Sequence, residues 1–434
     1  MNFMNKRRLA RENMGDSDVL AVVEPVDESV EAQVGEVDKD DQEVYALLGE
    51  GEVLEQDTET LEKMDDQVEA IEEDGEEITP EHADTVQIAT EGIANRWCLG
   101  SANSRKLAFE SFSGRRGDTR LVGEAIKDRL SDMWSTFIEW LSEMVDKMVD
   151  TFKKYVNAGK SMQKRSAKNA KLIEKLGSKD KDKIKGSFVT KLSIEGKYDA
   201  KKCITLATSV DSKAKSALAA SESFVDNAEE LISIATEKGS DSAKFNRVTE
   251  GEKKRDLFGE KVSKKLGSLG GGASDETQQV YALPGNGYLQ VAMYDYKPKD
   301  GSAVQAMISA VRLHGGEDQT EEKEIETPSV AFIEECNDAM NDIGKAFEKV
   351  EQGFTKTRNG LKKLTTAAKK AEKEVGKAEK GEAKDQARVA QKVAREAATS
   401  AQHTAKAVTY VYKTVGGGLS GLVTAGIAAY KKDA

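Results

Sequence analysis

The side chains most often used for catalysis are few and scattered in this sequence. The three histidines are His82, His314 and His403, and none has a neighbour at the spacing of a metal site. Carboxylates are so frequent that no general acid–base pair can be singled out. The residues therefore predict no catalytic group, no cofactor and no metal, and they indicate a protein that is not an enzyme.

The glycine-rich segments do not have the sequence of phosphate-binding loops. Gly270-Gly271-Gly272 lacks the Lys-Ser/Thr that follows in a Walker-type loop, and Gly285 and Gly287 fall in a predicted hairpin turn. No serine lies in a strand–turn–helix nucleophile elbow. These patterns argue against a nucleotide-dependent enzyme and against a serine hydrolase.

The cysteines and the N-terminal residues indicate the cellular compartment in which the protein is made. Cys98, Cys203 and Cys336 are too far apart for a zinc pattern, and an odd number leaves one thiol unpaired, which favours a reducing cytosol. Residues 1–14 lack the apolar core of a secretory signal. Because no run of about eighteen apolar residues occurs, no transmembrane helix is expected.

Basic side chains are concentrated in the C-terminal part of the sequence. Residues 351–434 contain 17 Lys+Arg against 8 Asp+Glu, and such a cationic surface can contact phosphates without base specificity. The alternative is an ordinary solvated helix face, because glutamates interleave with the lysines. The candidate DNA-contacting residues are Lys362, Lys363, Lys369, Lys370, Lys373, Lys377, Lys384, Arg388, Lys392 and Arg395.

The net charge of −12 conceals two parts of opposite sign. Residues 1–110 contain 9 Lys+Arg against 30 Asp+Glu, a net charge of −21, whereas residues 111–434 have a net charge of +9. An acidic segment that is poor in aromatic residues repels itself and buries little apolar surface. We therefore expect a largely disordered leader with short nascent helices.

A small-x-Glu sequence lies where the charge changes sign. Ala108, Phe109 and Glu110 precede Ser111 in a stretch rich in Ser, Asn, Arg and Gly, which is typical of sites of proteolysis. Ala89, Thr90 and Glu91 form a second candidate, just before Gly92. The pattern is short and recurs elsewhere in the chain.

The body that carries these residues is predicted to be mainly α-helical. Residues 119–157 show apolar side chains at spacings of three and four, which is the repeat of one helical face. Further helices are predicted over residues 158–176, 200–238, 329–356 and 359–414. We expect Gly416-Gly417-Gly418 to end the last of these, and residues 419–430 to form a short helix that is too short to span a bilayer.

The β-structure is predicted to be a small insertion. Residues 279–296 form a hairpin in which Asn286-Gly287 supplies the positive φ angles of the turn. Residues 188–194 alternate like a strand, and residues 304–313 fit either a strand or a short helix. The expected fold is thus a bundle of long amphipathic helices with a small β-hairpin or sheet insertion, preceded by the acidic leader.

These segments suggest four regions. They are an acidic leader resembling a propeptide (1–110), a helical domain (111–270), a β-hairpin-containing insertion (271–327) and a basic helical C-terminal region (328–434).

The acidic leader, the small-x-Glu junction and the basic helical body together resemble the internal head proteins of giant tailed phages of the phiKZ-like group. In that family a phage-encoded maturation protease removes N-terminal propeptides after a small-x-Glu motif. The resemblance implies that the protease cuts after Glu110, with Ala108 and Phe109 preceding the cut and Ser111 as the new N-terminus.

The same resemblance implies a structural protein of the virion. The chain would be made in the bacterial host cytoplasm, kept inside the capsid with the packaged DNA, and ejected with it. Its partners would be the protease, other capsid and inner head proteins, and further copies in a homo- or hetero-oligomer, with non-specific DNA contact and no stable membrane insertion.

Two other functions fit the residues. One is a cellular coiled-coil scaffold whose acidic leader is a permanent interaction tail. The other is a membrane-active injected effector that uses residues 419–430 as an anchor.

Overall fold

The computed structural model describes residues 28–97, 99, 119–236, 258–269, 278–299, 301–316, 319–375 and 381–432. The chain divides into two compact units. Unit 1 comprises residues 1–32 and 54–136, and unit 2 comprises residues 33–53 and 137–434.

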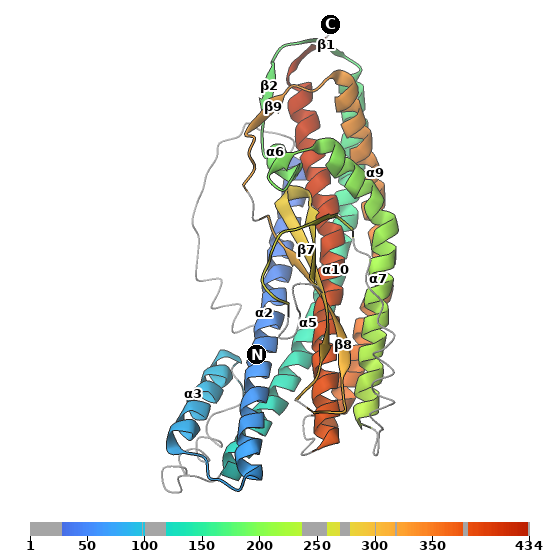
Figure 1. Cartoon of the computed structure of the whole chain (residues 1–434). Helices are drawn as coiled ribbons and strands as arrows, with labels where there is room; N and C mark the ends of the chain where they lie inside the picture. Colours follow the sequence, from blue (N-terminus) through green and yellow to red (C-terminus); the bar gives the residue numbers. More distant parts are fainter. Residues whose placement is uncertain are drawn as a thin grey trace. The chain divides into compact units, whose positions relative to one another are not determined.

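Long helices make up most of the described chain, which confirms the predicted mainly α fold (Figure 1). The helices are α2 (Glu28–Glu73), α3 (Pro80–Trp97), α5 (Thr119–Ile173), α6 (Phe188–Lys191), α7 (Ala200–Thr236), α9 (Val330–Val375) and α10 (Glu382–Ile427). None of the helices in the described ranges is long and apolar enough to cross a membrane.

Unit 1 contains residues 54–73 of α2 and the whole of α3, which residues 74–79 connect. Pro80 begins α3, where its missing N–H costs no hydrogen bond, and the Thr79 hydroxyl accepts a bond from the His82 amide. Near the other end of α3, Arg96 Nη1 and Trp97 Nε1 each lie 2.6 Å from a carboxylate oxygen of Asp57 on α2. Side-chain bonds therefore tie the end of α3 to α2, while the bond to Thr79 caps the start of α3.

The leader is more helical over its described residues than the sequence suggested. Apolar residues at intervals of seven, Leu47, Leu54, Leu61 and Val68, are all buried on α2. Such a stripe brings successive buried side chains to one helical face, and this burial offsets the repulsion among the carboxylates. Residues 1–27 lie outside the described ranges.

Unit 2 is built on residues 137–173 of α5 together with α7, α9 and α10, and α10 packs against α7, α9 and one strand of the sheet. The sequence predicted a break near residue 157, but α5 continues without interruption to Ile173. Gly159 allows α5 to approach α9 closely, because a Cβ atom there would lie 2.6 Å from the Gly344 carbonyl oxygen. Ser166 and Asn337 reinforce this contact, each bonding the other's backbone carbonyl through its side chain.

The largest sheet has four antiparallel strands in the order β5-β6-β7-β8. Their bounds are β5 Glu260–Val262, β6 Gln278–Leu283, β7 Gly287–Tyr296 and β8 Ala306–His314. The predicted hairpin is β6–β7, but its positive φ angles lie at Gly285 (72°) and Asn286 (59°), one residue earlier than expected. The turn is the short 3-10 element η3 (Pro284–Asn286), and Gly287 is already extended.

Three two-stranded sheets complete the β-structure of the described residues; two join distant parts of the chain, and the third is a local hairpin. They are β1 (Leu176–Lys179) with β10 (Tyr430–Lys432), β2 (Lys183–Lys185) with β9 (Glu324–Glu326), and β3 (Ser193–Ile194) with β4 (Lys197–Tyr198). The predicted strand over residues 188–194 is wrong in its first half, where Phe188 and Val189 are buried in the one-turn helix α6. Alternation over so few residues does not separate one helical turn from a strand.

The glycine run 416–418 does not end α10, contrary to the prediction. The helix continues to Ile427. A Cβ atom at Gly418 would lie 2.7 Å from Leu192 Cγ, and one at Gly426 would lie 2.8 Å from Ile333 Cδ1. These glycines therefore allow α10 to pack closely, and this packing outweighs their low helix propensity.

Candidate functional site

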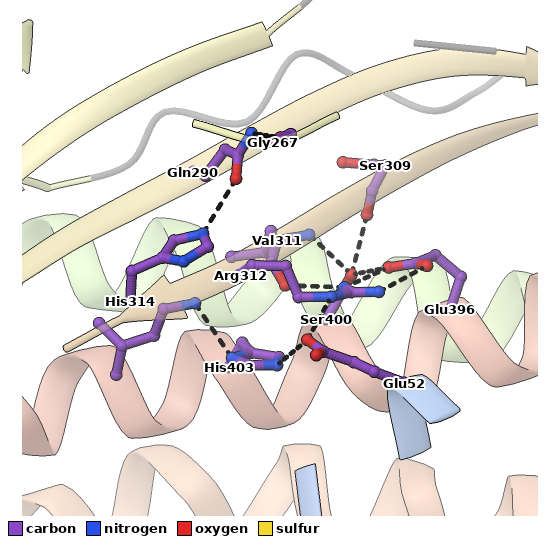
Figure 2. A network of polar contacts seen from close by, with 11 residues as sticks. Glu52, Gly267, Gln290, Ser309, Val311, Arg312, His314, Glu396, Ser400 and His403 are labelled. Atoms are coloured by element: carbon purple, nitrogen blue, oxygen red, sulfur yellow. Dashed lines mark hydrogen bonds and ion pairs between the residues drawn. The ribbon is translucent and has the colours of Figure 1, made fainter. Parts of the chain in front are cut away.

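Strand β8 lies at the edge of the sheet, and α10 covers that edge (Figures 1 and 2). An uncovered edge strand leaves backbone N–H and C=O groups without strand partners. Here the Val311 amide donates to Ser400 Oγ at 2.9 Å, and the Leu313 amide donates to His403 Nδ1 at 3.0 Å. Side chains of one helix thus take the place of a further strand.

Arg312 and Glu396 form a buried, two-bonded ion pair beside this edge. Arg312 Nη1 lies 2.7 Å from Glu396 Oε1, and Arg312 Nη2 lies 3.0 Å from Oε2 (Figure 2). Burial raises the pKa of the Glu396 carboxyl, but the Arg312 guanidinium outweighs burial and holds this pKa below its ordinary value. Glu396 is therefore ionised and compensates the buried charge of Arg312.

Ser400 links the ion pair to the strand. Its Oγ lies 2.9 Å from Glu396 Oε1 and 3.1 Å from the Ser309 carbonyl oxygen, and its single proton is donated to one of these acceptors. Ser309 and Val311 are alternate residues of β8, so one hydroxyl reaches two backbone groups of the edge. This arrangement fixes the register of the sheet on α10.

His403 is neutral in this environment. Because Nδ1 accepts the Leu313 amide, the neutral ring carries its proton on Nε2, which lies 3.7 Å from Glu52 Oε1. Burial lowers the pKa of His403 well below 6.5, and the nearby Arg312, Lys406 and His314 lower it further. The ring therefore acts as a hydrogen-bond acceptor for the strand.

A second histidine extends the polar contacts across the sheet. His314 Nε2 lies 2.9 Å from Gln290 Oε1 on the neighbouring strand β7. Gln290 Nε2 in turn donates to the Gly267 carbonyl at 2.6 Å (Figure 2). Most polar groups of this network bond one another, with the buried His403 Nε2 and Ser309 Oγ as exceptions, and these bonds hold β8 in place on α10.

The described cysteines and acidic side chains add no reactive centre. Burial raises the pKa of the Cys203 thiol to about 12 and that of the Cys336 thiol to about 12, so both remain protonated. Among the described residues, no group of three or more His, Cys, Asp or Glu side chains could hold a metal ion. Cys98 lies outside the described residues.

The sequence did not identify the network. The sequence does not single out Arg312, Glu396 or Ser400, and for His403 it argues against a metal site and favours a structural or surface role. The available signal was the spacing of Glu396, Ser400 and His403, which places three polar side chains on one face of an alanine-rich helix.

A groove between α7 and α9 carries part of the predicted cationic surface. It has a volume of about 660 Å³. Its lining combines three lysines with hydroxyl groups and one carboxylate: Lys362, Lys363, Lys370, Thr366, Ser233, Thr236 and Glu229, besides small and apolar residues. Ammonium and hydroxyl groups both bind phosphate oxygens, so the groove suits a polyanion.

The structure separates the ten predicted DNA-contacting residues into groups. Lys362, Lys363, Lys369 and Lys370 are exposed on α9. On α10 the exposed fractions are 5% for Lys384, 6% for Arg388, 1% for Lys392 and 3% for Arg395. Lys373 belongs to α9, and Lys377 lies outside the described residues.

The cations on α10 are buried because this helix packs between other elements. Lys392 Nζ, for example, lies 5.8 Å from the centroid of the Tyr296 ring on β7, which is a cation–π contact. The exposed part of the predicted cationic surface is therefore the part on α9.

Of the two candidate small-x-Glu cleavage sites, the structure describes one. Ala108, Phe109, Glu110 and Ser111 lie outside the described residues. Ala89, Thr90 and Glu91 lie within α3, and Thr90 is buried with its hydroxyl bonded to the Val86 carbonyl. Their peptide groups are thus engaged in a helix.

A family model described as phiKZ-like phage internal head proteins matches residues 36–420 of this chain. No curated protein and no solved structure matches it. The matched range contains both the polar network and the lysine groove.

Proposed function

The chain belongs to the phiKZ-like phage internal head proteins, and from this premise we propose that it is made with an acidic propeptide that a phage maturation protease removes after Glu110. As a member of this family it is a structural protein of the interior of the phage head, associated with other capsid components. The cut and its consequences are the part that we propose.

The charge reversal at the junction is the observation that carries the proposal. Residues 1–110 have a net charge of −21, and residues 111–434 have a net charge of +9. Packaged DNA is a polyanion, so a protein that remains beside it benefits from losing its acidic part. In this proposal the chain is a protease substrate, and its body stays with the DNA and is ejected with it.

Contact with DNA is proposed for the exposed lysines of α9. Lys362, Lys363 and Lys370 line the groove beside α7, and Lys369 is exposed on the same helix. Such a surface binds phosphates through counterion release and without base specificity. The buried cations of α10 are not part of this narrower proposal.

The N-terminus of the protein recovered from phage particles tests the cut. We expect the mature chain to begin at Ser111, as read by mass spectrometry of its N-terminal peptide. The substitution Glu110→Gln removes the carboxylate of the motif, and we expect it to abolish this N-terminus. Glu91→Gln is the matched control, which should leave Ser111 as the first residue.

Two results would count against the proposal. An intact Met1 in mature particles would exclude the processing step and favour a permanent acidic tail. A chain that begins at Gly92 would move the cut to the second candidate, Ala89-Thr90-Glu91.

A further inference from the structure

The leader is not confined to one part of the structure, because its residues belong to both compact units. Residues 54–97 of the leader share unit 1 with residues 119–136 of α5. Residues 33–53 share unit 2 with residues 137–434. The proposed cut after Glu110 therefore falls between chain segments that are folded together.

In unit 1, hydrogen bonds join the two sides of the proposed cut. The Ile78 amide donates to Thr119 Oγ1 at 3.0 Å, and the Thr119 hydroxyl lies 3.3 Å from the Glu76 carbonyl oxygen. Arg129 Nη1 lies 3.5 Å from the Leu99 carbonyl oxygen. Thr119 is the first residue of α5, so the leader supplies partners at the start of that helix.

Apolar side chains on both sides of the cut are buried in unit 1. A Cβ atom at Gly123 of α5 would lie 3.6 Å from Val68 Cγ1 of α2, which is ordinary van der Waals contact. The fully or nearly fully buried apolar residues include Leu54, Leu61, Val68, Ile78 and Trp97 before the cut, and Val122, Ile126, Met133 and Trp134 after it. Separating the two segments would expose such surface to water.

In unit 2, the leader helix packs on a buried tryptophan of the body. Trp140 Nε1 donates to the Leu47 carbonyl at 2.8 Å, and a Cβ atom at Gly51 would lie only 2.5 Å from Trp140 Cζ2. Leu47, Leu48 and Trp140 are all buried. The glycine thus permits an approach that no larger residue allows.

The leader also contributes a charge to the polar network of unit 2. Glu52 Oε1 lies 3.2 Å from Arg312 Nε and 3.7 Å from His403 Nε2 (Figure 2). Arg312 is paired through its Nη atoms with Glu396, so Glu52 occupies the remaining Nε position. The leader therefore bonds to the same network that covers the edge of the sheet.

We infer that the body has a docking surface for its own leader, and that a single cut after Glu110 yields a two-fragment complex instead of a free propeptide. The surface has one part in each unit: Thr119 and Gly123 of α5 in unit 1, and Trp140, Arg312 and His403 in unit 2. While the fragments remain together, the net charge stays at −12, so charge reversal requires dissociation as well as cleavage. The relevance of this to head maturation rests on the proposed function.

An engineered cut tests the docking without the phage protease. A recognition sequence for a specific protease replaces residues 104–113 of the full chain, and circular dichroism before digestion checks that the helices are intact. After complete digestion, we expect the leader to coelute with the body in size-exclusion chromatography. Elution of the leader as a separate species under native conditions would overturn the inference.

Matched variants then test the assigned contacts. Trp140→Phe removes the hydrogen bond to Leu47, and Glu52→Gln removes the charge beside Arg312. Each should weaken fragment association about fivefold, the factor that corresponds to a hydrogen bond of about 1 kcal/mol. Glu73→Gln, an exposed change of the same type on α2, is the control, and equal affinities for all three variants would refute the assignment.

The two proposals fail in different ways. Intact Met1 in particles would exclude processing but leave the docking measurement unaffected. Separate elution after the engineered cut would exclude docking but would not affect the N-terminus measured in phage particles.

Discussion

Ser400 and His403 show how side chains can complete the edge of a sheet. Their Oγ and Nδ1 atoms accept the Val311 and Leu313 amides, which face away from β7. Glu396, one turn earlier on α10, neutralises Arg312 of the same strand. These polar residues hold β8 in place on α10. Leaving a buried N–H donor without a partner would cost more free energy than a hydrogen bond contributes, so the contacts are needed for stability.

The depressed pKa of His403 predicts a pH-dependent stability. The folded protein keeps His403 neutral under the influence of burial, Arg312, Lys406 and His314, with Glu52 nearby, whereas the unfolded chain titrates near 6.5. Below that pH the unfolded state binds a proton that the folded state does not, so stability falls as the pH falls. From about pH 7.5 to about pH 5.5 we expect this residue to lower the free energy of unfolding by roughly 1 kcal/mol.

Urea unfolding followed by circular dichroism at the two pH values measures this effect. His403→Gln retains a hydrogen-bond acceptor for Leu313 but cannot titrate, so it should flatten the pH dependence by that amount. His82→Gln, at an exposed position on α3, should leave the dependence unchanged. Unchanged dependence in the His403 variant would contradict the prediction.

At the scale of elements, α10 owes its length to tertiary contacts. Gly416, Gly417 and Gly418 would weaken an isolated helix, but the neighbours of Gly416 and Gly418 occupy the space that side chains would need. Gly416 lies against Met162 of α5, and Gly418 lies against Leu192, which follows α6. Close packing of α10 therefore depends on the absence of a Cβ atom at particular turns.

Adjacent glycines of α10 should respond to alanine with opposite signs. At Gly417 the nearest atom to an added Cβ is Lys191 Nζ at 3.5 Å, so Gly417→Ala should raise stability by about 0.5–1 kcal/mol. At Gly418 the Cβ would meet Leu192 Cγ at 2.7 Å, so Gly418→Ala should lower stability by about 1–3 kcal/mol. Thermal unfolding midpoints compare the two, and changes of the same sign would refute this account of α10.

At the scale of the whole molecule, charge is divided along the chain rather than balanced locally. Residues 1–110 have a net charge of −21 and residues 111–434 a net charge of +9. Residues 351–434 by themselves have a net charge of +9. Since part of that basic charge is buried on α10, the DNA contact that we propose is limited to the exposed lysines of α9.

Neutralising the groove should weaken DNA binding and its dependence on salt. The triple substitution Lys362→Gln, Lys363→Gln and Lys370→Gln in the full chain removes three exposed charges. Each phosphate contact contributes about 0.9 to the slope of log affinity against log salt, so the slope should decrease by about 2–3. Fluorescence anisotropy with a labelled duplex at several low salt concentrations gives the slope.

The control for this measurement has the same change of charge. Lys171, Lys175 and Lys181 are exposed on other parts of the chain, and their triple substitution by Gln should change the slope less. Equal slopes for the two triple variants would mean that the groove is not a preferred contact.

The properties that follow from composition and local periodicity can be predicted from the sequence. The charge reversal, the mainly α fold, the helix over residues 200–238 and the β6–β7 hairpin were all predicted, because apolar spacing and turn residues act over short distances. The resemblance to the phage head family was also visible in the order of these segments, and the family match over residues 36–420 agrees with it.

Where the helices end, which distant residues pair and which basic side chains are buried depend on tertiary contacts. Helix α5 continues beyond residue 157, where Gly159 packs closely against Gly344. Helix α10 continues beyond its glycine run, where Gly418 packs closely against Leu192. In both cases tertiary packing outweighs the low helix propensity of glycine. Tertiary contacts also bring Arg312 to Glu396, 84 residues away in the chain, and bury four of the ten predicted DNA-contacting residues. Such pairings depend on which faces meet, and no short window of sequence contains that information.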